Sequence, residues 1–187
     1  MVSSILSTLI LLPLFGAISL LFVPGRYTTA IKGTALTISL ITFAASLFVW
    51  AAFDDATAKF QFVEVYSWIQ NSNINFVLGI DGISIFFVLL TTLLTPICIL
   101  ASWDPIKKNV KEYFIAFLVL EAIVIAAFVI LDLLLFYVFF EAVLIPMFII
   151  IGVWGSSERK LRAAYLFFLY TLLGSVLMLL GILYIYY

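Results

Sequence analysis

Two glutamates, Glu121 and Glu141, lie inside long apolar stretches of this 187-residue chain and are its strongest candidates for chemistry. Glu121 lies 11 residues before Asp132, and Glu141 lies 9 residues after it. If two helices run away from a turn at Asp132, a rise of about 1.5 Å per residue puts the carboxylates about 16 and 14 Å from the same membrane face. An ionised carboxylate at that depth costs a few kcal/mol, so it is neutral, paired or beside water. Both glutamates are therefore candidate proton relays.

A structural role is the alternative for both glutamates. A buried Glu can bond to a backbone carbonyl or to a Ser or Thr on a neighbouring helix and simply hold the bundle together. Pro146 favours a functional role for Glu141, because a proline five residues further on removes a helix hydrogen bond and can admit water or a kink beside the carboxyl. No Lys or Arg falls in the interior of any apolar stretch, so a cation that pairs with Glu141 has to come from another polypeptide.

The amino-acid composition indicates whether this chain folds in water or in a membrane. Hydrophobic residues make up 66% of the chain and charged residues 10%, with a mean hydropathy of +1.32, whereas soluble domains have roughly 45–50% apolar and about 25% charged residues. A soluble domain and a disordered chain are excluded, and a net charge of −1 gives no basic field for nucleic acid. One membrane domain covering residues 1–187 remains.

The numbers of His and Cys residues limit the cofactors that this chain can bind by itself. The chain has no His and a single Cys, Cys98, so it cannot form an internal disulfide or supply haem, iron–sulfur or zinc ligand sets alone. We expect no cofactor and no metal ion in this chain, and we interpret Cys98 as a small hydrophobic residue.

Uncharged runs of about 20 residues predict six transmembrane helices. The predicted spans are 3–23, 29–53, 83–103, 113–131, 133–154 and 163–187. The fourth and fifth share a run of 45 residues, from Tyr113 to Ser157, without a Lys or Arg, and Asp132 is the expected turn and helix cap between them. Fold class is therefore predicted to be an all-α, polytopic membrane protein.

The distribution of cations predicts the orientation of these spans. Eight of the nine Lys and Arg residues fall in the first, third and fifth loops, and only Lys59 falls in the second or fourth. Cations accumulate on the inner side of the membrane, so both chain termini are expected outside. The basic loops could also contact anionic phospholipid.

The long second loop, residues 54–80, contains a different pattern. Residues Phe60 to Ser67 alternate in the manner of a strand, and a polar NSNIN segment and FVLG follow, which predicts a β-hairpin over 60–78 on the outer surface. Asp81 is expected to cap the third helix. The other acidic residues of loops and helix ends, including Glu64, are interpreted as solvated or paired.

Three segments carry a family resemblance. The strings FVLGIDGISIFFVLLTTLLTPICILAS, LLLFYVFFEAVLIPMFIIIGVWGS and ERKLRAAYLFFLYTLLGS resemble NADH dehydrogenase subunit 4 of respiratory complex I in its mitochondrial form. The resemblance covers essentially the whole chain and is weakest over residues 1–72. That family belongs to the antiporter-like subunits, which are held to translocate protons in response to electron transfer from NADH to ubiquinone elsewhere in the complex.

The resemblance implies roles for both glutamates. Glu141 matches the carboxylate of the fifth helix, which pairs with a lysine on a later helix, and Glu121 matches a carboxylate of the fourth helix. It also implies a multi-pass protein of the mitochondrial inner membrane with both termini in the intermembrane space. Its expected partners are other membrane-arm subunits of complex I and phospholipid such as cardiolipin.

The chain departs from the family pattern after the sixth helix, where the family continues into helices with the channel lysines. We expect a companion polypeptide that carries the rest of subunit 4, and a fragment is the alternative. Two other functions stay open: a subunit of a cation/proton antiporter, whose relatives share the FFE helix, and a purely structural transmembrane scaffold.

Overall fold

Six helical spans and one hairpin form the part of the chain that the computed structural model describes, namely residues 4–57, 59–67, 75–156 and 158–186. The helices are α1 Ile5–Phe22, α2 Thr28–Ala51, α3 Ser84–Ala101, α4 Val110–Val129, α5 Leu133–Ala142, α6 Leu144–Trp154 and α7 Lys160–Tyr186. Helices α5 and α6 together form one span. A bilayer requires helices because each backbone group must find its partner inside its own segment. The predicted helical membrane fold is confirmed.

The predicted hairpin is also confirmed. Strand β1, Gln61–Ser67, pairs antiparallel with β2, Asn75–Ile80. A bulge between Gln61 and Glu64 interrupts the simple alternation of side chains, and Phe62 has a positive φ of 52° there. The polar turn expected before β2 lies mostly outside the described residues.

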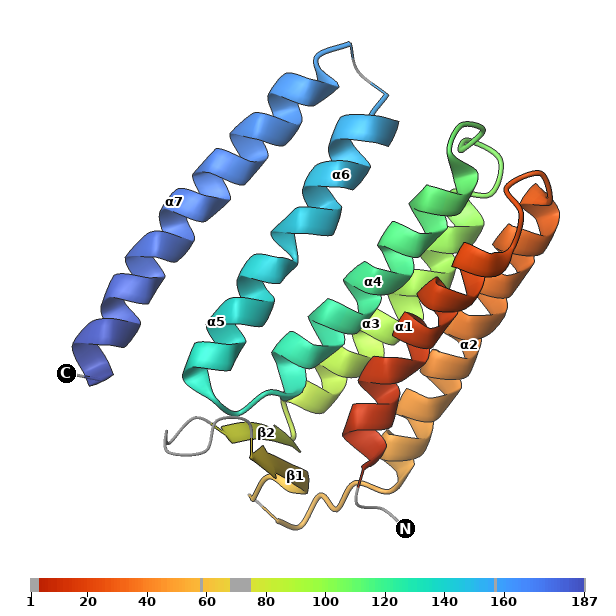
Figure 1. Ribbon diagram of the computed structural model, residues 1–187. Coiled ribbons are helices and arrows are strands. Elements are labelled where there is room, and N and C mark those ends of the chain that lie inside the picture. The colour runs from red at the N-terminus through yellow and green to blue at the C-terminus, as the bar shows by residue number, and fades with distance from the viewer. Residues whose placement is uncertain (1–3, 58, 68–74, 157, 187) are drawn as a thin grey trace.

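The helices form a group of four with two further spans beside it (Figure 1). Helices α1 to α4 pack against one another, the α5–α6 span lies against α4, and α7 packs on α6. The hairpin lies at one end of the bundle, together with the start of α1 and the end of α7 (Figure 1). We call this the hairpin end. We call the opposite end the lysine end; it holds the connecting residues 23–27, 102–109, 155–156 and 158–159.

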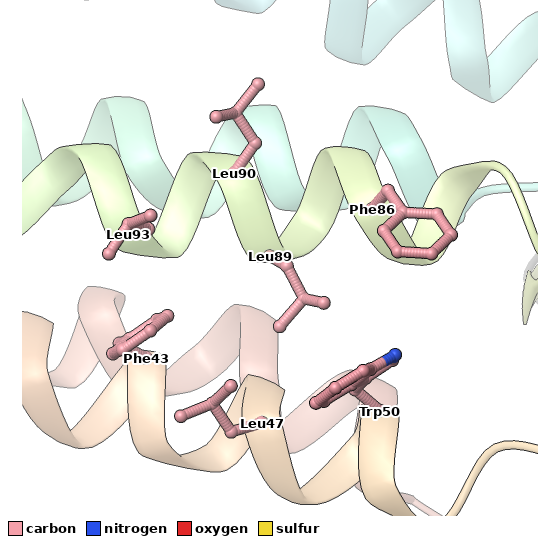
Figure 2. A pocket seen from close by; sticks show the side chains of 7 residues that line it. All are labelled: Phe43, Leu47, Trp50, Phe86, Leu89, Leu90 and Leu93. Atoms are coloured by element: carbon pink, nitrogen blue, oxygen red, sulfur yellow. The ribbon is translucent and has the colours of Figure 1, made fainter.

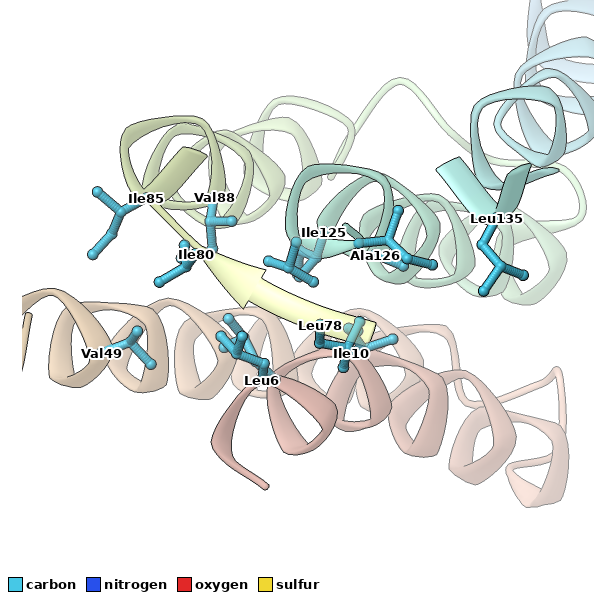
Figure 3. Packing of buried hydrophobic residues seen from close by; sticks show 13 residues of the cluster. Leu6, Ile10, Val49, Leu78, Ile80, Ile85, Val88, Ile125, Ala126 and Leu135 are labelled. Atoms are coloured by element: carbon cyan, nitrogen blue, oxygen red, sulfur yellow. The ribbon is translucent and has the colours of Figure 1, made fainter. Parts of the chain in front are cut away.

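Two apolar clusters fill the interior of the bundle at different depths. The first lies at the hairpin end and combines Leu6 and Ile10 of α1 with Leu78 and Ile80 of β2 and with Ile125 of α4, among others (Figure 3). The second lies toward the lysine end and is built around Leu20, Ile31, Ile99, Phe114 and Leu118, each fully buried. The two clusters fix the rotation of α1 to α4 about their axes, and hence which side chains face inward.

The turn between the two glutamate-bearing spans is fixed to the hairpin. Asp132 accepts a hydrogen bond from the backbone N–H of Leu135 at 3.0 Å, so it caps α5 as predicted. The N–H of Leu131 donates to the carbonyl of Val77 on β2 at 2.9 Å. This pairing holds the end of α4 and the start of α5 at the level of the hairpin.

Lysines bind helix C-termini at the lysine end. The Nζ of Lys111 donates to the carbonyl of Leu21 in α1 at 2.6 Å, and the Nζ of Lys160 donates to that of Val153 in α6 at 2.5 Å. Lys32 donates to the carbonyl of Trp103, just after α3. The last carbonyls of a helix have no partner in the helix and carry partial negative charge, so a cation stabilises them.

Candidate functional site

Glu121 lies on the inward face of α4 and is nearly inaccessible, with 2% of its surface exposed. Among the residues that the structure describes, neither of its carboxyl oxygens has a hydrogen-bond partner. A buried carboxyl without a partner is costly, and such groups are retained where they have a function.

A layer of polar side chains separates the two apolar clusters. It consists of Ser39, Thr42 and Ser46 of α2, Thr92 and Thr95 of α3, and Glu121 of α4, and each of these is at most 8% exposed. We call these six residues the polar layer. Its hydroxyls cannot be identified from the sequence, because Ser and Thr are common inside apolar spans and their rotation toward one another depends on helix packing.

The hydroxyls of the polar layer have partners. Ser46 and Thr92 bond to each other at 2.7 Å across the α2–α3 contact. Thr42 donates to the carbonyl of Ile38, and Thr95 donates to that of Thr91 at 3.0 Å. Glu121 is therefore the member of the layer whose hydrogen-bonding capacity is unused.

The opposite side of the α2–α3 pair is apolar. A crevice of about 330 Å³ opens there, and Figure 2 shows its wall of aromatic and leucine side chains, in which the indole nitrogen of Trp50 is the polar atom. Its lining residues are Phe43, Leu47, Trp50, Phe86, Leu89, Leu90 and Leu93. The fully buried Ser and Thr side chains of these two helices lie instead in the polar layer.

Glu141 lies near the end of α5 and is half-buried. Its Oε1 is buried and has no hydrogen-bond partner among the described residues. Glu121 lies eight residues before the end of α4, and Glu141 lies eight residues after the start of α5. Both are about 12 Å from the hairpin end of their helices, so they share a depth in the membrane.

A helix interruption follows Glu141. Helix α5 ends at Ala142 and α6 begins at Leu144, although α6 continues in nearly the same direction (Figure 1). Pro146 has no N–H for the carbonyl of Ala142, so the local loss of a helix hydrogen bond that the sequence predicted is present. Ala142 and Pro146 also line an apolar groove of about 530 Å³ between α4 and α6, which ends near Glu112 and Trp154.

The structure places the two glutamates at one depth but does not bond them to each other. Glu121 is buried in the bundle interior, whereas Val119, about 160° away around α4, lines the groove on the side of α5 and α6. Glu121 has no hydrogen-bond partner in the described part of the chain, so Glu141 is not its partner. Each carboxyl therefore has at least one buried oxygen without a hydrogen-bond partner among the described residues.

Family comparisons identify the chain. A family model described as the amino terminus of NADH-ubiquinone oxidoreductase chain 4 matches residues 1–131. The chain belongs to the NADH-ubiquinone oxidoreductase chain 4 family. A second model, described as the transmembrane region of NADH:quinone oxidoreductases and Mrp antiporters, matches residues 130–187.

Individual relatives of this chain 4 family member support the same family membership. It is 60% identical over 182 residues to the protein named NADH-ubiquinone oxidoreductase chain 4 from Marchantia polymorpha, covering 97% of the chain and 37% of that protein. It is 63% identical over 178 residues to the protein of the same name from Arabidopsis thaliana, covering 95% of the chain and 36% of that protein. The chain therefore spans a little over a third of the length of these relatives.

A solved structure supports the same fold. A chain of the respiratory complex I from Thermus thermophilus superimposes with a TM-score of 0.78 and 27% sequence identity, covering 95% of this chain and 35% of that one. The predicted resemblance to the chain 4 family is confirmed.

Sequence reasoning missed one acidic residue of this chain 4 family member. Glu64 of β1 is 3% exposed and is not a solvated loop residue. Its carboxylate accepts from the backbone N–H groups of Leu6 and Ser7, at 2.8 and 3.2 Å, and from the hydroxyls of Ser7 and Tyr66. It thereby caps α1 from a distant segment. Because the partners are 57 and 58 residues apart in sequence, no local pattern reveals them.

Asp81 has the capping role that the sequence predicted. Its Oδ1 accepts from the N–H groups of Ile83 and Ser84, at 3.1 and 2.6 Å, and the Ser84 hydroxyl accepts from the N–H of Asp81 at 2.9 Å. The bond from the Ser84 N–H lowers the pKa of Asp81 below its usual value of 3.8. Within the described residues, no group of three or more His, Cys, Asp or Glu side chains is placed to hold a metal ion. The expectation of no cofactor stays a prediction.

Proposed function

We propose that this chain is the N-terminal part of a membrane-arm subunit of respiratory complex I and contributes to proton translocation coupled to electron transfer from NADH to ubiquinone. The proposal is carried by two glutamates at one depth of the membrane in a chain 4 family member. Among the described residues, both carboxyl oxygens of Glu121 and the Oε1 of Glu141 are buried without a hydrogen-bond partner. Groups of this kind are held inside a membrane where protons or ions pass. The electron transfer itself takes place in other subunits, because this chain has no His and one Cys.

Glu141 is the acid whose charge we expect to change during the cycle. Its carboxyl is half-buried beside the interruption at Val143, and its Oε1 has no hydrogen-bond partner in the part of the chain that the structure describes. A cation that approached this oxygen would favour the ionised form, and its withdrawal would favour the protonated form. Glu121 then relays protons along the middle of the membrane or couples to an adjacent subunit.

A companion polypeptide with the remainder of subunit 4 completes the path in this proposal. The chain spans a little over a third of its relatives, and Lys and Arg are missing from the interior of its spans. Almost none of the α7 span is buried, so further helices have a surface on which to pack. Other membrane-arm subunits and a phospholipid such as cardiolipin are the remaining proposed partners.

The proposed location is the mitochondrial inner membrane, with the hairpin end and both termini on the intermembrane-space side. The cation-rich loops support this orientation, because basic loops stay on the side from which helices are inserted. The relatives from Marchantia polymorpha and Arabidopsis thaliana support membership in a respiratory complex by their names.

Replacing Glu141 by Gln tests the proposal, because Gln keeps the size of the side chain and removes its titration. We expect the complex to assemble, as measured on native gels, and proton-coupled NADH:ubiquinone turnover in membrane vesicles to fall about tenfold or more. Glu158→Gln, a change of the same type at an exposed loop position, is the matched control. Normal proton translocation by the Glu141→Gln complex would refute the proposal.

An antiporter subunit is the second candidate, because the family model over residues 130–187 also describes Mrp antiporters. Purification with quinone-reducing subunits favours complex I, and purification with antiporter subunits favours this alternative. A purely structural scaffold predicts a different result again: Glu121→Gln and Glu141→Gln would impair assembly and leave the turnover of each assembled complex unchanged.

A further inference from the structure

The apolar groove between α4 and α6 runs from the lysine end toward the middle of the membrane. On α4 its lining extends from Glu112 to Ile123, which is about 16 Å of helix, and on the α5–α6 span it extends from Trp154 back to Ala142, which is about 18 Å. The hydrocarbon core of a bilayer is about 30 Å thick, so one leaflet is about 15 Å deep. The groove therefore has the length of one leaflet.

The groove is narrow for its length. A volume of about 530 Å³ along about 16 Å of helix gives a mean cross-section of about 33 Å², or a width of about 6 Å. A helix with its side chains is about 10–12 Å across, so a helix can cover the groove but cannot enter it. A single unbranched hydrocarbon chain can enter, and it would contact aliphatic walls that include Ile115, Val119 and Ile149.

Two lysines are held at the mouth of the groove. The Nζ of Lys111 donates to the carbonyl of Leu21, which itself lines the groove, at 2.6 Å. An ammonium group has three N–H donors, so this bond leaves two of them available. The indole N–H of Trp154 donates to the carbonyl of Lys108 at 2.8 Å, which holds the exposed Lys108 beside the groove wall. The mouth therefore offers two ammonium groups to an anion.

A carboxylate lies at the same mouth. Glu112 is exposed, lines the groove and directly follows Lys111 in α4. A headgroup with negative charge alone would be attracted by the lysines and repelled by this carboxylate. Phosphoethanolamine suits both, because its phosphate accepts from lysine and its ammonium donates to the carboxylate. Phosphatidylcholine cannot form the second bond, because its quaternary ammonium has no N–H group.

Selectivity among lipids has to come from this headgroup contact. Lipid tails are as apolar as leucine, so the groove gains little when one tail replaces another. We propose that the groove binds one acyl chain of a phosphatidylethanolamine, with its phosphate at Lys108 and Lys111 and its ammonium at Glu112. This inference makes the phospholipid partner of the proposed function specific, and it rests on that proposal for its setting in a complex I membrane arm.

Photo-crosslinking of the intact complex in phosphatidylcholine liposomes tests the assignment. The probe is a trace of phosphatidylethanolamine with a diazirine near the end of one acyl chain, and labelled peptides are mapped by mass spectrometry. We expect label near Ile123 of α4 and near Ala142 on the facing span, where the deep end of the groove lies. Replacing part of the phosphatidylcholine by unlabelled phosphatidylethanolamine should remove this label, whereas replacing it by cardiolipin should not.

Two variants test the headgroup contact and the groove separately. Glu112→Gln keeps the size of the side chain and should lower the labelling about two- to fivefold, the effect of losing one exposed ion pair. Asp104→Asn, at an exposed position of the same end, is its control. Ala116→Phe fills the groove from α4 and should abolish the label at the deep end, whereas Ala30→Phe, at an exposed position of α2, should not.

The outcomes separate this inference from the proposed function. Equal labelling by a phosphatidylcholine probe, unchanged labelling in Glu112→Gln or stronger competition by cardiolipin would each overturn the proposed lipid site. Groove peptides that stay unlabelled while neighbouring lipid-facing peptides are labelled would show that protein covers the groove, which also overturns it. Labelling is read without turnover, and proton translocation is decided by Glu141→Gln, so a failure of either is seen by itself.

Discussion

Replacing Glu64 by Ala should release the first turn of α1. The carboxylate accepts from the N–H of Leu6 at 2.8 Å and from that of Ser7 at 3.2 Å, and it is 3% exposed. Hydrogen bonds to a charged group contribute about 1.5–3 kcal/mol each, and water can replace part of the bond to the half-buried Ser7. The expected loss of local stability is therefore about 2–3 kcal/mol.

Amide hydrogen exchange of the intact complex measures this loss directly. Exchange of the Leu6 and Ser7 amides reports the free energy of opening the start of α1, so 2–3 kcal/mol corresponds to exchange that is about 30- to 150-fold faster. Glu64→Gln keeps one acceptor oxygen, and an intermediate acceleration is expected. Asp55→Asn, at an exposed position of the same connection, is the control. If Glu64→Ala and Asp55→Asn exchange alike in this turn, the capping role of Glu64 is wrong.

Two further predictions concern helix contacts and caps. A Cβ at Gly16 would lie 2.6 Å from the side chain of Ile38, so Gly16→Leu should destabilise the contact of α1 and α2 by about 1–3 kcal/mol. The measurement is a lower thermal midpoint of unfolding. Gly33→Leu is the control, because a Cβ at Gly33 meets nothing within 4 Å, and it should leave the midpoint unchanged. The pKa of Asp81 is lowered in the folded chain, so its cap stabilises α3 above pH 3.8, its usual pKa, and this stabilisation is lost as the pH falls through the lower folded pKa. Hydrogen exchange at the start of α3 should therefore be faster in Asp81→Asn than in the unchanged protein at neutral pH. Equal protection of these amides in the two proteins would contradict the cap.

The sequence predicts the parts of this fold that depend on local chemistry. Runs of apolar residues define the spans, and Asp81 and Asp132 act as the caps that their positions indicate. The interruption after Glu141 follows from Pro146, because a missing N–H is a property of one residue. Each of these features is settled within about one helical turn.

Features that depend on helix rotation are not predictable in this way. Thr92 and Thr95 are ordinary residues of an apolar span until the packing of the helices buries them in the polar layer, where Thr92 bonds to Ser46. The role of Glu64 is not predictable from local sequence either, because its partners belong to a helix that precedes it by more than 50 residues. Roles for Glu121 and Glu141 came from their depth and stay predictions.

The lysine contacts at the ends of α1, α3 and α6 have a consequence for how the chain keeps its orientation. In the predicted orientation, three of the cations that would direct insertion are bound, after folding, to carbonyls at helix ends, which carry partial negative charge. Reversal of the bundle would need three ammonium groups to leave these carbonyls and cross a medium of low dielectric constant. The cations are expected to set the orientation during insertion, and their bonds in the folded structure then oppose its reversal.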